Sequence, residues 1–182
     1  MRDFGAKIVS LDGFAKIRPT LGRIVATSGA FDPIHPGHIS CILDSKQFGD
    51  SLVVVVNGNW FCTNKKGRPF QDLDTRALIV SAIRGVDYVI PFEIESDMTV
   101  CKALEVIQPH VFTKGGDRKT VGTQWDNAGT IPEWPVCQKY GTRIIAGIGS
   151  DKQWSSSWFL KDWAEHALKD GAKQQTETPQ EI

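Results

Sequence analysis

Apolar residues follow two alternating patterns along the chain: short unbroken runs, and longer stretches with apolar residues three or four positions apart. The short runs are rich in β-branched residues, which is typical of strands covered on both faces. They predict five strands, at residues 24–27, 52–56, 88–90, 111–113 and 143–146. The longer stretches predict helices at residues 37–48, 72–84, 97–108, 135–140 and 155–168, and a polar, glycine-containing loop is predicted at 58–70.

Strands that alternate with helices predict a parallel sheet joined by right-handed crossovers. We therefore predict an α/β fold, a Rossmann-like three-layer α/β/α arrangement with a five-stranded parallel sheet. The length of 182 residues suits one domain, predicted at 1–168, and the polar segment 169–182 is predicted to be disordered. Such sheets bind ligands outside the carboxyl ends of the strands, where the strand order reverses.

Composition and charge exclude several classes of partner. Lysine plus arginine and aspartate plus glutamate both number 21, so net charge attracts neither nucleic acid nor a membrane surface. The sequence has no apolar run near the roughly 20 residues that cross a bilayer, and its first residues lack the apolar stretch of a signal peptide. We therefore predict a cytoplasmic protein. The four cysteines form no C-x-x-C pair, so we expect reduced thiols and no structural zinc.

The stretch "SGAFDPIHPGHIS", residues 28–40, directly follows the first predicted strand. Gly29 allows a sharp turn, and Gly37 lets a ligand approach the backbone where the next helix begins. A helix N-terminus offers free N–H groups and the positive end of a dipole, which together favour an anion. His35 and His38 would face one side of the first helical turn and donate hydrogen bonds to a polyphosphate. We interpret the stretch as a nucleotide-phosphate site rather than as two histidines that cap a turn.

The segment "GAFDPIHPGH" resembles the signature of the cytidylyltransferase-like nucleotidyltransferases, the H-x-G-H superfamily. The segments "KIVSLDGF", "NKKGRPFQDLDTRALIVSAIRGVDYVIPFE", "PHVFTKGGD" and "YGTRII" resemble its adenylyltransferase branch of bacterial ADP-heptose synthesis. The similarity runs from about residue 7 to residue 161. The resemblance implies that a phosphate or phosphonate oxygen of a second substrate attacks the α-phosphorus of a nucleoside triphosphate, and that pyrophosphate leaves without a covalent enzyme intermediate.

The resemblance also implies roles for individual residues. His35 and His38 would contact the triphosphate and stabilise the transition state, and Lys66 best matches the family lysine, with Lys65 as the alternative. Contacts with the nucleotide are implied for Gly29, Ala30, Phe31, Asp32, Gly37, Lys114, Gly115, Gly116, Asp117, Ser155, Ser156 and Ser157. Arg76 matches the family's D-R arginine, and we predict contacts with the acceptor substrate for Asn57, Trp60, Arg68 and Arg76.

Each of these segments also has a purely structural interpretation, which the sequence leaves open. The lysines and Arg68 would then form a solvated charge run, and Arg76 a surface ion pair. The segment 114–117 would be an ordinary glycine turn, and the serines at 155–157 a helix cap. Trp60 would pack its own loop against the protein instead of forming a wall of the acceptor site.

The expected partners are ATP or CTP and a phosphorylated small-molecule acceptor, with Mg²⁺ carried by the nucleotide and no metal held by the protein. The family commonly forms homodimers, so a homodimer is expected. The chain departs from the family in "SGAFD", in "NWFCTN" and at residues 118–134, all near the expected acceptor site. Three functions therefore compete: an adenylyltransferase acting on a heptose-like sugar 1-phosphate, a cytidylyltransferase acting on a polyol phosphate or phosphonate, and a nucleotide-binding regulatory module without catalysis.

Overall fold

A parallel six-stranded sheet forms the centre of the protein, with strand order β1-β4-β3-β2-β5-β6. The computed structural model describes residues 7–95, 97–115, 131–150 and 153–176. The strands are β1 (Lys7–Ile8), β2 (Ile24–Gly29), β3 (Ser51–Asn57), β4 (Tyr88–Phe92), β5 (Val111–Gly115) and β6 (Arg143–Ile148). The predicted α/β fold and its five parallel strands are confirmed. The additional edge strand, β1, has only two residues, too few to produce a recognisable apolar pattern.

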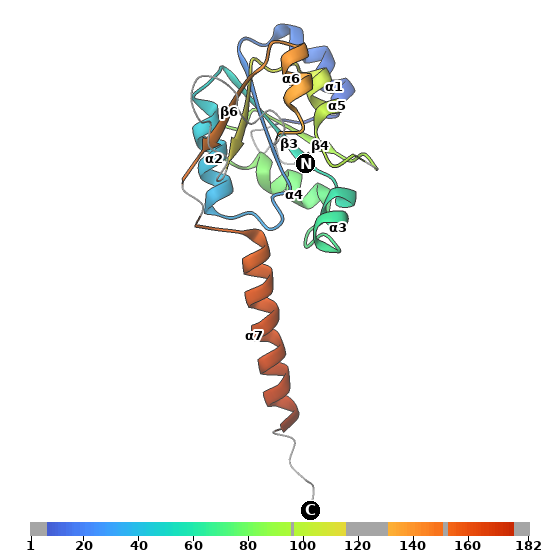
Figure 1. Cartoon of the computed structure of the whole chain (residues 1–182), viewed down its shortest axis with the longest axis vertical. Coiled ribbons are helices and arrows are strands. Elements are labelled where there is room, and N and C mark those ends of the chain that lie inside the picture. Colours follow the sequence, from blue (N-terminus) through green and yellow to red (C-terminus); the bar gives the residue numbers. More distant parts are fainter. Residues whose placement is uncertain (1–6, 96, 116–130, 151–152, 177–182) are drawn as a thin grey trace, which may run out of the picture.

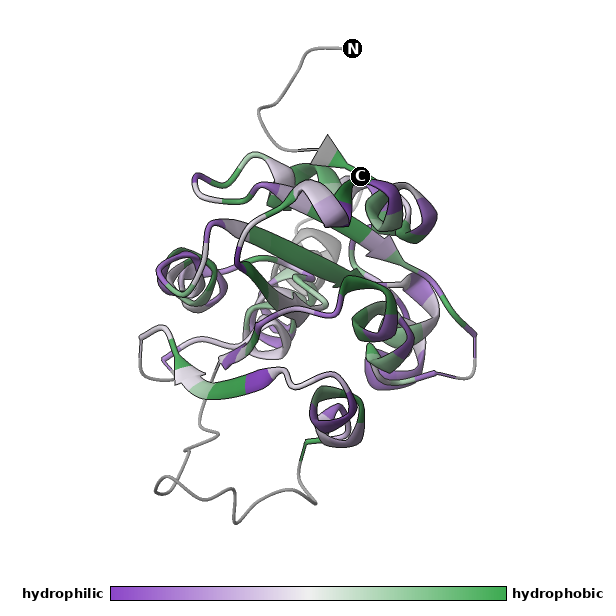
Figure 2. Ribbon diagram, turned by 90° about the horizontal axis from the view of Figure 1, so that it is seen from above, coloured by the Kyte–Doolittle hydropathy of each residue, from purple (hydrophilic) through white to green (hydrophobic). Residues whose placement is uncertain are grey.

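Helices cover both faces of the sheet (Figures 1 and 2). They are α1 (Leu11–Ile17), a 3-10 turn η1 (Arg18–Thr20), α2 (Pro36–Lys46), α3 (Asn59–Lys66), α4 (Leu73–Ser81), α5 (Cys101–Ile107), α6 (Trp134–Lys139) and α7 (Ser156–Thr176). Helices α1, α5 and α6 lie together on one face, and α2 and α4 lie on the other (Figure 1).

Two hydrophobic clusters result from the alternation of side chains along the strands. Ile24 and Ala26 of β2 pack into the cluster with α1, α5 and α6, whereas Val25 packs into the cluster with α2 and α4. Because successive side chains point to opposite faces, a strand covered on both sides must be apolar at every position. This explains the unbroken run in β3, where the residues from Leu52 to Val56 are all fully buried.

The strand order reverses at β2. From β2 the chain proceeds through β3 to β4 toward one edge, and then returns to the other side of β2 to form β5 and β6. The carboxyl ends of β2 and β5 therefore form the crevice in which open α/β sheets bind ligands. The stretch 28–40 begins at this point, as predicted from the sequence.

The predicted loop at 58–70 is wrong for its first half, which forms helix α3 (Asn59–Lys66). The residue before the helix, Gly58, has no side chain to cap it. The Glu93 carboxylate, which follows β4, accepts hydrogen bonds from the backbone N–H groups of Asn59 at 2.5 Å and Trp60 at 2.9 Å. A cap supplied from a distant part of the chain leaves no local sequence signal.

Helix α7 is longer than the sequence pattern predicts. It continues to Thr176, through the first part of the segment predicted to be disordered, and extends away from the rest of the protein (Figure 1). Alanine, lysine and glutamine, which favour helices, are frequent in this part of the sequence. Among the described residues, no helix has both the length and the apolar character that crossing a bilayer requires.

Candidate active site

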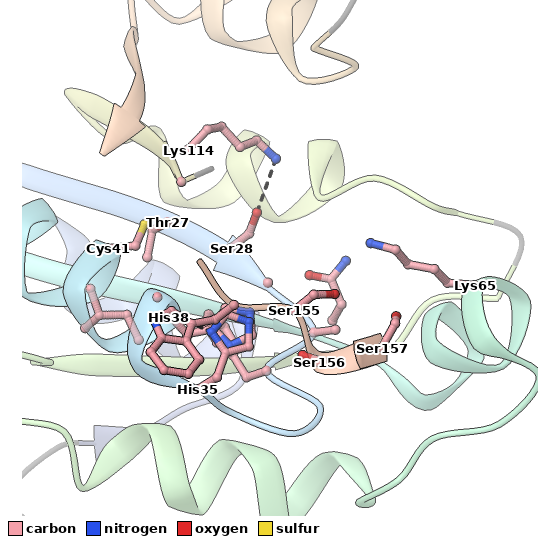
Figure 3. A pocket seen from close by; sticks show the side chains of 18 of the residues that line it. Thr27, Ser28, His35, His38, Cys41, Lys65, Lys114, Ser155, Ser156 and Ser157 are labelled. Carbon is pink, nitrogen blue, oxygen red and sulfur yellow. Dashed lines mark hydrogen bonds between the residues drawn. The ribbon is translucent and has the colours of Figure 1, made fainter. Parts of the chain in front are cut away.

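A cleft of about 650 Å³ lies at the carboxyl ends of β2, β3 and β5 (Figure 3). The start of α2, the helix α3, the segment before α6 and the start of α7 complete its walls. The predicted site residues that line the cleft are Gly29, Ala30, Phe31, His35, Gly37, His38, Asn57, Lys65, Lys66, Lys114, Gly115, Ser155, Ser156 and Ser157. Gly116 and Asp117 lie outside the described residues.

The two histidines lie at the N-terminus of α2. His35 caps the helix, because its Nδ1 atom accepts a hydrogen bond of 3.3 Å from the backbone N–H of His38. A neutral His35 therefore carries its proton on Nε2 and can donate from that atom. The two imidazole rings stack with centroids 3.6 Å apart and planes 17° apart, and Phe31 packs edge-on against His38 at 5.1 Å. The pair thus forms one rigid surface of the cleft (Figure 3).

The surroundings of both imidazoles favour the neutral form. Burial lowers the pKa of His35, and the nearby charge of Lys66 lowers it further, while a backbone hydrogen bond opposes this. Burial also lowers the pKa of His38 to about 3, assisted by His35, Lys66 and Lys65. A neutral imidazole donates through one N–H group, and an anion bound beside it would favour its protonated form.

Two lysines at the end of α3 bring positive charge to the cleft. Lys66 is half-buried, and its ammonium group donates to the backbone carbonyl of Asp32 and lies 3.9 Å from that residue's Oδ2 atom. Burial lowers the pKa of Lys66, and the Asp32 carboxylate opposes this effect. Lys65 is exposed and lies over the ring of Phe61, with its Nζ atom 5.4 Å from the ring centroid. The structure therefore brings both candidate lysines into the same cleft as the histidines.

The end of β5 contributes Lys114 and Gly115. A side chain at position 115 has no room, since a Cβ atom there would lie 2.9 Å from the Cys41 Sγ atom of α2. The ammonium group of Lys114 lies 3.0 Å from the Glu133 Oε1 atom and 3.5 Å from the Ser28 hydroxyl (Figure 3). Glycine at this position lets β5 and α2 approach each other closely.

The serines at 155–157 begin α7 at the edge of the cleft. The carbonyl of Ser155 accepts the N–H groups of Trp158 and Phe159, and the hydroxyl of Ser156 donates to the carbonyl of Pro33 at 2.9 Å. The second contact fixes the start of α7 to the loop before α2. The N-termini of two helices, α2 and α7, thus meet at one cleft, and each favours an anion there.

Buried polar atoms without a partner also gather in this cleft. Within the described ranges, three buried side-chain nitrogen or oxygen atoms have no hydrogen-bond partner: His38 Nδ1, Asn57 Oδ1 and Glu133 Oε2. All three residues line the cleft. Buried polar atoms in proteins are nearly always paired, so this concentration sets the cleft apart from the other buried regions that the structure describes.

A family model described as cytidylyltransferase-like matches residues 26–132. This range contains the histidine pair, the two lysines of α3 and the end of β5. The chain belongs to the cytidylyltransferase-like family. Membership of this family makes the chain a nucleotidyltransferase.

Several curated relatives of this nucleotidyltransferase are named bifunctional protein HldE. The protein from Actinobacillus pleuropneumoniae is 36% identical over 116 residues, which cover 60% of this chain and 24% of the relative. The protein from Sulfurimonas denitrificans is 36% identical over 134 residues, which cover 71% of this chain and 27% of the relative. The chain thus matches about a quarter of the length of these relatives.

Solved structures share the fold of this nucleotidyltransferase. The lipopolysaccharide core biosynthesis protein from Thermoplasma volcanium has a TM-score of 0.56 at 29% identity, covering 71% of this chain and 98% of that one. Pantoate-beta-alanine ligase from Francisella tularensis has a TM-score of 0.55 at 19% identity, covering 82% of this chain and 68% of that one. The second likeness concerns the fold alone.

Arg76, predicted to contact the acceptor substrate, does not line the cleft of the nucleotidyltransferase. Only 1% of its surface is exposed. Its guanidinium group donates to the carbonyl oxygens of Gln71 at 2.9 Å, Ala30 at 2.8 Å and Asn57 at 2.5 Å, and to Asn59 Oδ1 at 2.9 Å. These bonds join the turn after β2, the end of β3 and the start of α3. In this structure Arg76 fixes the walls of the site, and its side chain does not reach the cleft surface.

Asp32 has a similar role, although the family resemblance implies that it contacts the nucleotide. Its carboxylate is fully buried and accepts the backbone N–H groups of Phe70 at 2.9 Å and Gln71 at 2.8 Å. It therefore fixes the segment after α3 to the turn after β2. Asp32 does not line the cleft, so the structure does not bring its side chain to the ligand.

Of the other three residues with predicted acceptor contacts, Asn57 lines the cleft, whereas Trp60 and Arg68 lie outside its lining. Arg68 is exposed. Phe61 lines the cleft in place of Trp60. The reason is the helical conformation of α3, in which neighbouring residues point about 100° apart. The predicted loop gave no basis for deciding which of the two aromatic side chains faces the cleft.

Sequence reasoning missed several residues of the cleft wall. Met98, Pro132, Glu133, Gln153 and Trp154 line it from segments that carry no family motif. Pro132 and Glu133 lie within the segment 118–134, whose departure from the family pattern was the only signal for them. The others come into the cleft through the packing of the segments around β4 to α7, which no local pattern encodes.

Proposed function

We propose that this nucleotidyltransferase transfers an adenylyl group from ATP to a heptose-like sugar 1-phosphate and releases pyrophosphate. The observation that carries the proposal is the stacked pair of His35 and His38 at the N-terminus of α2, with Lys65 and Lys66 lining the same cleft. The names of the relatives, bifunctional protein HldE and a lipopolysaccharide core biosynthesis protein, support a sugar phosphate as the acceptor.

In the proposed reaction, a phosphate oxygen of the acceptor attacks the α-phosphorus, and the bond from that phosphorus to the β-phosphate oxygen breaks. His35 and His38 donate hydrogen bonds to the phosphates, and Lys66 and Lys65 neutralise the charge that grows on them. The N-termini of α2 and α7 hold the pyrophosphate portion. Catalysis then depends on positioning and on donors already in place, so no covalent intermediate with the protein is needed.

Magnesium is part of the proposal as an ion carried by the triphosphate, where it neutralises phosphate charge. Across the described part of the chain, no group of three or more His, Cys, Asp or Glu side chains could hold a metal ion. Asp32 is also engaged by backbone N–H groups. The residues present therefore suit an ion whose ligands are mainly phosphate oxygens and water.

A cytidylyltransferase is the second candidate. The matching family model is described as cytidylyltransferase-like, which favours CTP with a polyol phosphate or phosphonate as the acceptor. The adenylyl assignment instead depends on the resemblance of "KGGD" and of the N-terminal segment to the adenylyltransferase branch.

Pyrophosphate release separates the candidates. The purified chain is incubated with ATP or CTP, Mg²⁺ and a panel containing heptose 1-phosphate, glycerol 3-phosphate and a phosphonate. We expect release only with ATP and heptose 1-phosphate. A preference for CTP would contradict the adenylyl assignment, and nucleotide binding without release in any combination would instead indicate a regulatory module.

Two further properties belong to the proposal. A cytoplasmic location suits an enzyme that consumes a nucleoside triphosphate, and a homodimer is expected from the family resemblance. Sedimentation velocity of the purified chain at micromolar concentration tests the second property, and a single monomeric species would contradict it.

A further inference from the structure

Glu133 places a carboxylate in the cleft wall just before α6, on the face of the sheet opposite α2. Only 4% of its surface is exposed. Burying a carboxylate is unfavourable unless hydrogen bonds or a positive charge compensate for the lost water. Each oxygen atom of Glu133 is therefore expected to have a hydrogen-bond donor or a positive charge as its partner.

One oxygen of Glu133 is paired and the other is not. The Oε1 atom lies 3.0 Å from the ammonium group of Lys114, which is itself placed over the Phe112 ring at 4.8 Å. The Oε2 atom is buried and has no hydrogen-bond partner among the residues that the structure describes. The ion pair fixes the orientation of the carboxylate, so the unpaired oxygen has a defined place in the wall.

The triphosphate cannot satisfy this oxygen, because ionised phosphate groups only accept hydrogen bonds. A carboxylate oxygen that lacks a partner needs a donor. The nucleotide offers its base amino group and its ribose hydroxyls, and a sugar phosphate offers hydroxyls, so the hydroxyl group is the donor common to both substrates. The cleft thus combines cationic and N–H groups that suit phosphates with a separate acceptor that suits a hydroxyl.

We propose that Glu133 Oε2 accepts a hydrogen bond from a sugar hydroxyl of a bound substrate, either the ribose of the nucleotide or the sugar of the acceptor. Glu133 is then a specificity-determining residue that favours hydroxylated ligands over deoxy analogues. The inference rests on the proposed function only in that a nucleotide and a sugar phosphate occupy the cleft. A hydrogen bond to a charged group of this kind corresponds to an affinity difference of about 10- to 100-fold.

The test is the substitution Glu133→Gln, which keeps the shape of the side chain. The amide oxygen still accepts from Lys114, and repulsion between the amide NH₂ and the ammonium group disfavours the flipped orientation. The NH₂ group then occupies the place of Oε2 and cannot accept from a hydroxyl. Glu105→Gln is the matched control, because Glu105 forms an exposed pair with Lys139 at 3.6 Å on the outside of the protein.

Calorimetry measures the binding of ATP, 2′-deoxy-ATP and 3′-deoxy-ATP to the wild type and both variants without an acceptor, with the CTP series in parallel. If Glu133→Gln weakens the affinity for the ribonucleotide by 10- to 100-fold but leaves the affinity for one deoxy analogue unchanged, Glu133 recognises the ribose. Unchanged nucleotide binding with a 10- to 100-fold higher KM for heptose 1-phosphate and a retained kcat supports recognition of the acceptor. Equal losses for all nucleotides, or changes below twofold throughout, would overturn the role of Glu133.

The same experiment separates this inference from the proposed function. A wild-type chain that binds neither ATP nor CTP overturns both. Wild-type binding and turnover with an unaffected Glu133→Gln variant overturn only the role of Glu133. If the glutamine variant does not fold by circular dichroism, Glu133→Asp replaces it, because aspartate keeps the charge beside Lys114 while withdrawing the carboxylate from the ligand.

Discussion

Arg76→Met tests whether this arginine builds the site or contacts a substrate. Methionine retains most of the apolar stem, so the substitution removes mainly the guanidinium group. Four acceptors would lose their donor: the carbonyl oxygens of Gln71, Ala30 and Asn57, and Asn59 Oδ1. The first three are backbone groups at the junctions of β2, β3 and α4, so the loss affects the framework of the cleft.

The expected loss of stability follows from these acceptors. An acceptor left unpaired in a buried position costs about 1–3 kcal/mol. The lower end of this range applies here, because water from the cleft can enter the space that the guanidinium group leaves. Four acceptors at about 1 kcal/mol each then lower the free energy of unfolding by about 4 kcal/mol. This is a large part of the roughly 5–15 kcal/mol by which domains are usually stable, although the variant is expected to remain folded at 25 °C.

Urea unfolding followed by tryptophan fluorescence measures the effect. With a slope of about 2 kcal/mol/M, the midpoint should fall by about 2 M. Arg84→Met is the control, because Arg84 is exposed just after α4, and it should change stability by no more than about 0.5 kcal/mol. An Arg76→Met variant as stable as the control but without turnover would refute the reasoning, because the guanidinium group would then act on a substrate.

The histidine pair and the end of β5 lead to three more expectations. His38→Ala should keep the wild-type circular dichroism spectrum and lower kcat by about 10²–10³-fold, and near-normal turnover would exclude a catalytic role. The pKa of His38 is about 3 in the folded chain and 6.5 for an exposed imidazole, so the unfolded state takes up the proton first as the pH falls. The stability that depends on neutral His38 is therefore complete above about pH 6.5, and the free energy of unfolding declines toward pH 3 by up to about 1.4 kcal/mol per pH unit. Urea titrations at several pH values should find this slope reduced in His38→Ala. Gly115→Ala should destabilise the protein by about 1–3 kcal/mol through contact with the Cys41 sulfur, and adding Cys41→Ala should recover most of this loss; a strictly additive double variant would contradict the contact.

Local sequence patterns were sufficient to predict an element wherever the residues of one segment determine its conformation. The run of β-branched residues in β3 requires cover on both faces, and the alternation with helices then implies a parallel sheet. The proline and glycine between His35 and His38 mark a helix N-terminus directly after a strand, so the start of α2 at the edge of the sheet was predictable from one stretch of sequence.

Contacts between distant segments gave no such signal. The cap of α3 comes from Glu93, and without it the stretch 59–66 is indistinguishable from a polar loop. The choice of Phe61 over Trp60 depends on that helix. The burial of Arg76 depends on carbonyl groups from separate parts of the chain that meet only in the folded protein.

The sequence by itself determined the parallel α/β architecture, the family and the position of the histidine pair at the start of a helix, because each depends on residues close together in the chain. Only the tertiary structure decided which side chains are free to meet a ligand. A side chain's availability depends on what its polar atoms already bind: Asp32 and Arg76 are engaged mainly by backbone groups, whereas Glu133 retains one unpaired oxygen in the cleft wall.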